Sequence, residues 1–431
     1  MQSFCRPFRR TLPATAALLL ATISNGQAGE PLTAYINAHI WDGTGDALHE
    51  DAALIVRGDT VDAVHSMSEL ELPKGSRVVD LEGQYLIPGL INAHGHVGTA
   101  RGLETGAAIY SRDNVEQQLQ LYGHYGITSV VSLGDEPPQA FEVRDHWQPS
   151  PAGLARLWLS GPVIEGNTAA AARAEVRERL EFDPDWIKFR VDDQLGRVEK
   201  KPIDASRAII ETAHEHELPA ATHIVTLDDA IALLENGADL IAHSVRDQPV
   251  NQTLIDLMKA RDVCMTPTLT REISTYIYAE RPDFFDDPFF LKHADPDVLE
   301  ELQQDAVQRR YTGQDADYYR EALPLAKDNM MVLHDAGVRI AMGTDSGPPG
   351  RFQGYFEHME MEMMQEAGMT PEEVLISATR DAAACMGIDD TVGTLQSGKA
   401  ADFVVLSENP LEAVRHLRAI TGVYIGGIRA E

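Results

Sequence analysis

The feature that most constrains the fold is an alternation, through the middle of the chain, between short apolar segments and segments of helical period such as PIDASRAIIETAHEHE and LDDAIALLENGA. Each apolar segment leaves room for a helix after it, which predicts parallel βα units. The eight predicted strands read GLINAHGH (89–96), GITSVVSLGD (126–135), ARLWLSGPVI (155–164), DWIKFRV (185–191), LPAATHI (218–224), ADLIAHS (238–244), DVCMTPTLT (262–270) and GVRIAMGTDS (337–346).

Eight such units indicate an α/β fold of the (β/α)8 barrel type over residues 89–388. The alternative is an open doubly wound sheet. Such a sheet usually carries a glycine-rich phosphate turn after its first strand, and HGHVGTARG does not match one.

Both ends of the chain show another pattern, in which short β-type runs alternate with turn residues. Near the amino end the turns include DGTG and RGD, and near the carboxyl end GTLQSGKAADFVVL and ITGVYIGGIRAE have the same character. We therefore predict one small β-sandwich domain that is built from residues 29–88 together with residues 389–431.

Residues 1–28 have the three-part pattern of a secretory signal peptide. Arg6, Arg9 and Arg10 form a basic region, TLPATAALLLATIS is an apolar region too short to span a bilayer, and GQA supplies small residues at the cleavage site. We expect cleavage after Ala28, no remaining membrane anchor, and a periplasmic or secreted protein exported by the Sec or the twin-arginine route. The net charge of −31 argues against nucleic acid or an anionic membrane surface as a partner.

Two cysteines follow the leader, Cys264 in DVCMTPTL and Cys385 in AAACMGI. Neither has the spacing of a metal site, and this pair does not indicate a disulfide framework. We expect both to be buried as small apolar side chains.

Polar side chains stand at or near the carboxyl ends of the predicted strands, where barrel enzymes carry their active residues. Each lies in an otherwise apolar run, in which an unpaired polar group would be costly. A lone histidine, lysine or aspartate in such a run is more often structural, but six at equivalent strand ends point jointly to a site. They are His94, His96, Lys188, His223, His243 and Asp345.

These residue types suit two divalent metal ions, with zinc as the first choice and manganese or cobalt compatible with the same ligands. Residues two apart on a strand point the same way, so the two histidines of the first strand can hold one ion together with Asp345. His223 and His243 can hold a second ion. Burial would favour a neutral Lys188, which can react with carbon dioxide to give a carbamate that bridges the two ions.

The motifs around these residues resemble those of the amidohydrolase superfamily of metal-dependent hydrolases, over nearly the whole mature chain. IPGLINAHGH is similar to the first-strand motif of that family, and IKF to the segment with its carboxylated fourth-strand lysine. THIV and GADLIAHSV resemble the segments with its fifth- and sixth-strand histidines, and GTDSG the segment with its eighth-strand aspartate. The most similar subgroup is the imidazolonepropionase-like, prolidase-like branch.

The resemblance implies a role for each residue. His94, His96 and Asp345 would bind the more buried ion. His223 and His243 would bind the other, with carboxylated Lys188 as the bridge. Imidazolonepropionase itself and the deaminases typically use one metal and lack the fourth-strand lysine, so this lysine argues for two metals and against both activities.

Resemblance and metal chemistry together imply hydrolysis of a C–N amide or peptide bond in a small substrate, by a hydroxide that bridges the two metals. Asp345 would take the hydroxide proton and pass it to the leaving amine. The expected substrates are those of a dipeptidase, a carboxypeptidase or an N-acyl amino acid hydrolase, and the expected assembly is a homo-oligomer. A lactone or phosphotriester hydrolase with the same site, and a barrel scaffold without catalysis, remain as alternatives.

Substrate-binding residues are expected on the fourth strand and after the seventh, where the long segment 270–328 is either a lid or a surface excursion. Arginine binds carboxylates in a fork, although an arginine is more often a structural ion-pair partner. A tyrosine hydroxyl in this segment could donate to a substrate carbonyl. The candidates are Arg190, Arg271, Tyr276 and Tyr278.

Overall fold

The structure, a computed structural model, describes residues 32–45, 47–146 and 153–430. The predicted leader lies outside these residues. In the described part of the chain, no helix combines the length and the hydropathy that crossing a membrane requires.

Seven of the predicted strands form two parallel sheets, ordered β10-β9-β6 and β11-β12-β13-β14. The two sheets meet at a parallel bridge between Ile164 and Phe189, where the amide of Ile164 donates to the carbonyl of Lys188 over 2.8 Å. The strands are β6 (Leu90–Gly95), β9 (Ile127–Ser132), β10 (Arg156–Leu159), β11 (Ile187–Arg190), β12 (Ala220–His223), β13 (Leu240–Ala242) and β14 (Cys264–Thr266).

The eighth predicted strand is an irregular extended segment, residues 339–346, that closes the barrel. Parallel bridges join Ile340 to Met265 of β14 and Ser346 to Gly95 of β6. The pairing is interrupted near its end because Asp345 has a φ of 58°, in the left-handed region that a regular strand cannot contain. The (β/α)8 barrel prediction is thus confirmed, with one strand held by isolated bridges.

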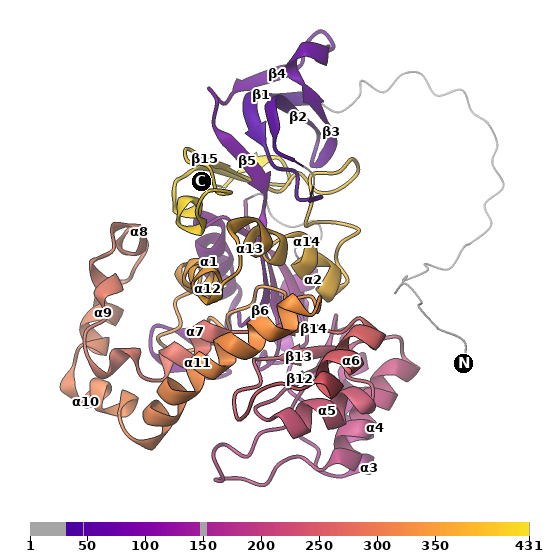
Figure 1. The fold of residues 1–431 in the computed structure, drawn as a ribbon, viewed down its shortest axis with the longest axis vertical. Coiled ribbons are helices and arrows are strands. Elements are labelled where there is room, and N and C mark those ends of the chain that lie inside the picture. The colour runs from indigo at the N-terminus through magenta and orange to yellow at the C-terminus, as the bar shows by residue number, and fades with distance from the viewer. Residues whose placement is uncertain (1–31, 46, 147–152, 431) are drawn as a thin grey trace, which may run out of the picture.

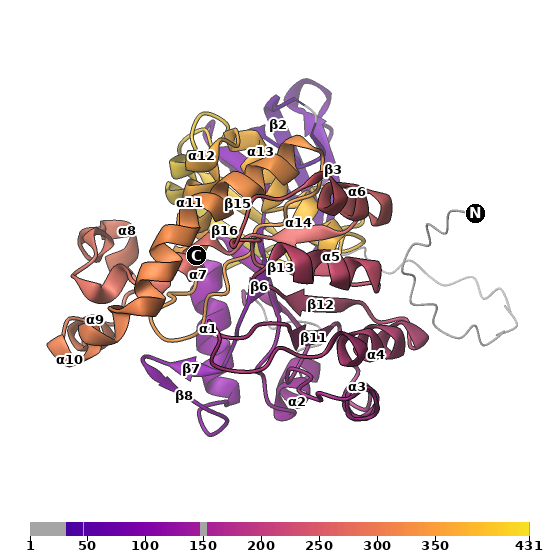
Figure 2. The same ribbon diagram turned by 60° about the horizontal axis from the view of Figure 1, so that its bottom comes forward.

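Helices cover the outside of the barrel, and several begin at a side-chain cap. Thr168 caps α3, Thr226 caps α5 and Asn251 caps α6. In Figure 2 strands β6, β11, β12 and β13 lie at the centre, with α3 to α6 on their outer side. The helices that follow the eight strands in turn are α1 (Arg112–His124), α2 (Gln139–Asp145), α3 (Ala169–Leu180), α4 (Ile203–Glu215), α5 (Leu227–Glu235), α6 (Gln252–Arg261), α11 (Gln314–Asp335) and α12 (Tyr355–Ala367).

Short helices fill the long segment between β14 and α11, and in Figure 1 the helices α8 to α10 project to one side of the barrel. Aromatic side chains hold this excursion together; the rings of Phe284 and Phe290, for example, meet edge to face at 4.9 Å. Its α-helices are α7 (Leu269–Ser274), α8 (Pro288–Leu291), α9 (Pro296–Leu302) and α10 (Asp305–Gln308), and its 3₁₀ turns are η2 (Ile277–Ala279), η3 (Asp283–Asp286) and η4 (Arg309–Tyr311).

Both ends of the described chain share one sheet of order β17-β16-β15-β5-β1-β2-β3, with β4 beside β1. The antiparallel pair of β15 with β5 joins them, with Phe403 opposite Pro88 (Figure 1). The composite β domain is confirmed. Its strands are β1 (Leu32–Ile40), β2 (His49–Arg57), β3 (Thr60–Ser66), β4 (Arg77–Asp80), β5 (Tyr85–Pro88), β15 (Phe403–Leu406), β16 (Ile420–Ile425) and β17 (Ile428–Arg429).

The two cysteines form a disulfide, so the prediction of two separate buried thiols is wrong. Cys264 begins β14, and Cys385 lies in α14 (Arg380–Met386), which follows α13 (Pro371–Ser377) after the last barrel helix. Their Cα atoms are 5.9 Å apart although 121 residues separate them in sequence. Only the tertiary packing of the last helix under the barrel brings them together, which sequence spacing cannot show.

Candidate metal centre

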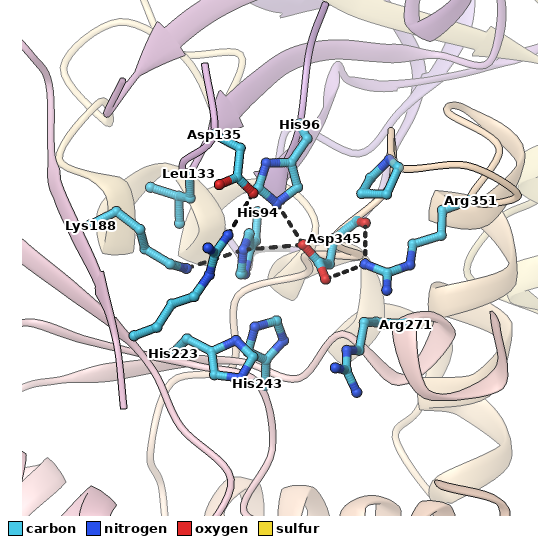
Figure 3. A pocket seen from close by; sticks show the side chains of 12 residues that line it. His94, His96, Leu133, Asp135, Lys188, His223, His243, Arg271, Asp345 and Arg351 are labelled. Carbon is cyan, nitrogen blue, oxygen red and sulfur yellow. Dashed lines mark hydrogen bonds and ion pairs between the residues drawn. The ribbon is translucent and has the colours of Figure 1, made fainter. Parts of the chain in front are cut away.

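All six predicted ligands line one cavity of about 180 Å³ (Figure 3). They come from β6 and the residue after it, from β11 and β12, from the residue after β13 and from the end of the eighth segment, so the cavity opens at the carboxyl ends of the strands. This is the end at which parallel barrels carry their active residues.

His94, His96 and Asp345 form the tightest group in this cavity. Nε2 of His96 lies 2.6 Å from Oδ1 of Asp345, and Nε2 of His94 lies 3.7 Å from the same oxygen. One ligand atom from each residue lies within 4.8 Å of the others. Gly95 faces the opposite side of the strand, where a Cβ would meet side-chain atoms of Tyr122 and Val130 at 2.9 Å. Two imidazoles and a carboxylate in this arrangement are a metal-binding group.

Lys188 is buried next to this group, with its Nζ 3.3 Å from Nε2 of His94. Desolvation lowers the pKa of its ammonium to about 7, against the opposing pull of Asp345. Near neutral pH a large fraction of the side chain is therefore a neutral amine. A neutral amine is the form that reacts with carbon dioxide.

His223 and His243 face each other on the other side of the cavity, with ring centroids 4.2 Å apart. The His243 ring in turn lies 4.9 Å from that of His94. Desolvation lowers the pKa of His223 to about 3 and holds the pKa of His243 well below its usual value. Both imidazoles are thus neutral, as metal ligation requires.

Hydrogen bonds fix the orientation of the imidazoles. Nδ1 of His96 donates to the carbonyl of Gly134 over 2.7 Å, which leaves its Nε2 for a ligand. Nδ1 of His243 lies 2.6 Å from the hydroxyl of Thr268.

Both His243 and Thr268 have left-handed backbones, with φ of 74° and 52°. Non-glycine residues adopt this region rarely, so the strand ends around the cavity carry backbone strain.

Glu357 of α12 supports the group from behind. Its Oε1 accepts hydrogen bonds from Asn92 (2.6 Å), Thr344 (2.7 Å) and Ser346 (2.5 Å), and its Oε2 accepts from the amide of Gly354 (2.6 Å). Asn92 in turn accepts from the amide of the first-strand ligand two residues later, over 2.9 Å. The carboxylate thereby ties the first strand to both neighbours of the aspartate ligand.

Asp345 also contacts Arg351, whose Nη1 lies 2.5 Å from Oδ2. Burial alone would raise the pKa of this carboxyl, but Arg351 and His96 hold it well below its usual value. Burial would likewise lower the pKa of His96, yet its bonds to Asp345 and Glu136 raise it to about 10. In the metal-free protein His96 is therefore protonated, and a metal ion would displace that proton.

Comparison with known proteins fits this geometry. The model of the amidohydrolase family matches residues 85–429, which is most of the chain. The chain belongs to the amidohydrolase family. It is accordingly a hydrolase with a His-His-Asp metal-binding group, as its sequence motifs predict.

Individual relatives of this amidohydrolase are distant. Imidazolonepropionase of Pseudomonas putida is 25% identical over 376 residues, which cover 82% of this chain and 87% of that protein. Ochratoxinase of Aspergillus niger is 37% identical over 97 residues, which are 21% of this chain and 19% of that protein. A solved Xaa-Pro dipeptidase with methionine bound in its active site gives a TM-score of 0.75 at 20% identity, covering 92% of this chain and 99% of that chain. The structural likeness shows the fold.

The predicted substrate residues of the amidohydrolase divide into two pairs. Arg190 and Arg271 line the cavity, and Arg271 also pairs with Glu272 over 3.0 Å. Tyr276 and Tyr278 do not line it. Tyr278 is fully buried and its hydroxyl donates to the carbonyl of Gly350, so it belongs to the core of the excursion.

Two charged wall residues were not among the sequence predictions. Arg351 follows the eighth-strand motif in GTDSGPPGR, and Asp135 is the last residue of the predicted second strand, where it pairs with Arg190 over 2.5 Å. Their position at the end of a predicted strand or in the loop after it was the only available signal. A wider cavity of about 530 Å³ continues outward from the first and shares Arg190, His223, Arg271, Pro348 and Arg351 with it.

Proposed function

We propose that this amidohydrolase binds two divalent metal ions and hydrolyses the amide bond of a small substrate with a free carboxylate, such as a dipeptide or an N-acyl amino acid. The observation that carries the proposal is the buried Lys188 between the imidazole pairs, 3.3 Å from His94. An unmodified buried lysine there has no carboxylate within ion-pair distance among the described residues. As a carbamate it would offer oxygen ligands to both ions.

The donor set fits metal ions. Buried neutral imidazoles and a carboxylate are ligands that zinc prefers, and manganese or cobalt can use them as well. His94, His96 and Asp345 would hold one ion and His223 with His243 the other, with Lys188 between them. When bound, such ions polarise a carbonyl and lower the pKa of water towards neutrality.

Asp345 is placed to move the proton. Its Oδ1 faces His94 and His96, and its Oδ2 contacts Arg351 on the cavity wall. The carboxylate can take a proton from the attacking water and deliver it to the nitrogen that leaves, since an amide nitrogen leaves poorly unless protonated. Arg271 lies on the same wall, where its guanidinium can hold the substrate carboxylate in a fork.

Relatives support an amide substrate. The solved structures of similar fold include an Xaa-Pro dipeptidase, a phenylurea hydrolase and ochratoxinase.

We further propose that the protein is exported. The signal-type leader supports this, and so does the disulfide, since disulfides persist in oxidising compartments.

The test is a substrate panel on protein loaded with zinc, manganese or cobalt, containing dipeptides, N-acyl amino acids, lactones and phosphotriesters. We expect turnover of the first two classes, about two ions per chain by metal analysis, and none of this turnover in an Asp345→Asn control that keeps its fold. Turnover of lactones or phosphotriesters alone would support the alternative hydrolase. Two bound ions without turnover of any class would support the scaffold.

A further inference from the structure

The outer cavity, which we call the vestibule, is rich in arginine although the protein is strongly acidic. The chain has 67 acidic and 36 basic residues, yet five arginines and only two aspartates line the vestibule. Arginine is weakly hydrated and binds carboxylates through two parallel hydrogen bonds, so it is the basic residue best suited to capture an anion. The charged wall residues are Arg190, Arg197, Arg271, Arg310, Arg351, Asp192 and Asp315.

The arginines lie at two depths. Arg190, Arg271 and Arg351 also line the inner cavity beside the metal ligands (Figure 3). Arg197 and Arg310 line only the vestibule. A substrate carboxylate close to the scissile bond would engage the inner group, which leaves the outer pair for a different part of the ligand.

Arg310 is the outer arginine best placed to receive an anion. Arg197 already pairs with Asp315 over 2.8 Å. Among the described residues, no hydrogen bond or ion pair holds the guanidinium of Arg310, which is exposed in the turn η4. Its guanidinium is therefore available without breaking an existing ion pair.

We propose that the vestibule is a second anion subsite, so that the preferred substrate carries an acidic side chain in addition to its terminal carboxylate. This rests on the proposed function for the location of the scissile bond. Four of the five arginines already pair with a carboxylate in or behind the wall, so Arg310 supplies the uncompensated positive charge that a second substrate carboxylate would meet.

The first experiment compares isosteric dipeptides that differ only in one charge, Ala-Glu with Ala-Gln and Glu-Ala with Gln-Ala. We expect kcat/KM to favour the acidic member of at least one pair by about tenfold, because only the carboxylate can accept charge-assisted hydrogen bonds from the arginine. Arg310→Gln should remove most of that preference and leave the rate with the amide peptide within about twofold. Added salt should weaken the preference, since an exposed cation is screened.

Arg309→Gln is the matched control, because Arg309 is the neighbouring exposed arginine and does not line the vestibule. It should leave the preference unchanged. Equal rates for the acidic and amide peptides in both pairs, or the same loss of preference in both variants, would overturn the subsite.

A binding measurement separates this inference from the proposed function. Calorimetric titration of the metal-loaded protein in the Asp345→Asn background, in which we expect no hydrolysis, compares N-acetylglutamate with N-acetylglutamine. We expect the acid to bind about tenfold more tightly, and the difference to disappear in Arg310→Gln but not in Arg309→Gln. Equal affinities would refute the subsite even if peptides are cleaved. Selective binding without cleavage of any amide would leave the subsite standing and remove the peptidase function.

Discussion

Glu357 allows the sharpest test of how the metal ligands are held, through the substitution Glu357→Gln. The side chain is fully buried and accepts four hydrogen bonds between 2.5 and 2.7 Å. Glutamine keeps the shape but has one oxygen and no charge. If that oxygen keeps the three side-chain donors, its amide nitrogen faces the amide of Gly354, and two donors oppose each other.

The expected cost follows from these contacts. The opposed donors cost about 1–3 kcal/mol, and each of the other three bonds falls from charge-assisted to neutral strength, by about 1 kcal/mol. Burial raises the pKa of Glu357, so the carboxylate has a desolvation cost that glutamine relieves in part. We expect a net loss of about 2–4 kcal/mol in the free energy of unfolding. Metal affinity should fall by about 10- to 100-fold, as is typical when a group behind the ligands is changed.

Urea unfolding of the metal-free protein measures the first effect, and a competitive titration with a metal chelator measures the second. Glu366→Gln is the control on the same helix, because Glu366 is exposed and pairs with Lys327 over 3.0 Å. It should change stability by less than about 0.5 kcal/mol. Equal destabilisation by the two substitutions, or an unchanged metal affinity in Glu357→Gln, would refute the supporting role.

Three further predictions concern the site and the disulfide. Asp345→Asn should lower kcat by at least about 100-fold in steady-state assays while circular dichroism stays unchanged, and retained turnover would exclude its role in proton transfer. The Lys188→Ala variant should hold about one metal ion per chain instead of two. In the unchanged protein, occupancy of the second metal site should rise as the pH increases through 7 and be lost below it. The reason is that burial lowers the pKa of the lysine to about 7 and only the neutral amine reacts with carbon dioxide. Replacing Cys264 and Cys385 by alanine should lower the free energy of unfolding by roughly 5 kcal/mol, given a closed loop of 121 residues, and a loss below about 1 kcal/mol would show that the bond adds little.

The barrel and the six residues at its strand ends could be predicted because their signals are local. An apolar run that ends in a histidine or an aspartate can be recognised within about eight residues, and the parallel arrangement of the strands then brings their carboxyl ends together. The left-handed backbone conformation of Asp345 could not be predicted from the sequence, since aspartate tolerates this conformation but does not require it. The eighth segment is consequently less regular than its sequence indicates.

Features that depend on long-range packing could not be predicted. The disulfide requires the position of α14 under β14, and the role of Glu357 requires the angle at which α12 returns to the barrel. The burial of Tyr278 could not be predicted either, because an aromatic residue in a long insertion has the same local sequence pattern whether it lines a cavity or packs in a core. Arg351 was missed because the loop after the eighth strand carries no periodicity.

The shared sheet has a consequence for how the protein is made. The single residue Gly89 separates β5 from β6, the strand that carries His94, whereas the partner strand of β5, β15, begins only at Phe403. During synthesis, one edge of β5 therefore remains unpaired until β15 has been translated, and the barrel cannot close until residues 339–346 have been translated. Folding of this chain should thus be largely post-translational, and a chain that stops before Phe403 should be prone to edge-to-edge aggregation.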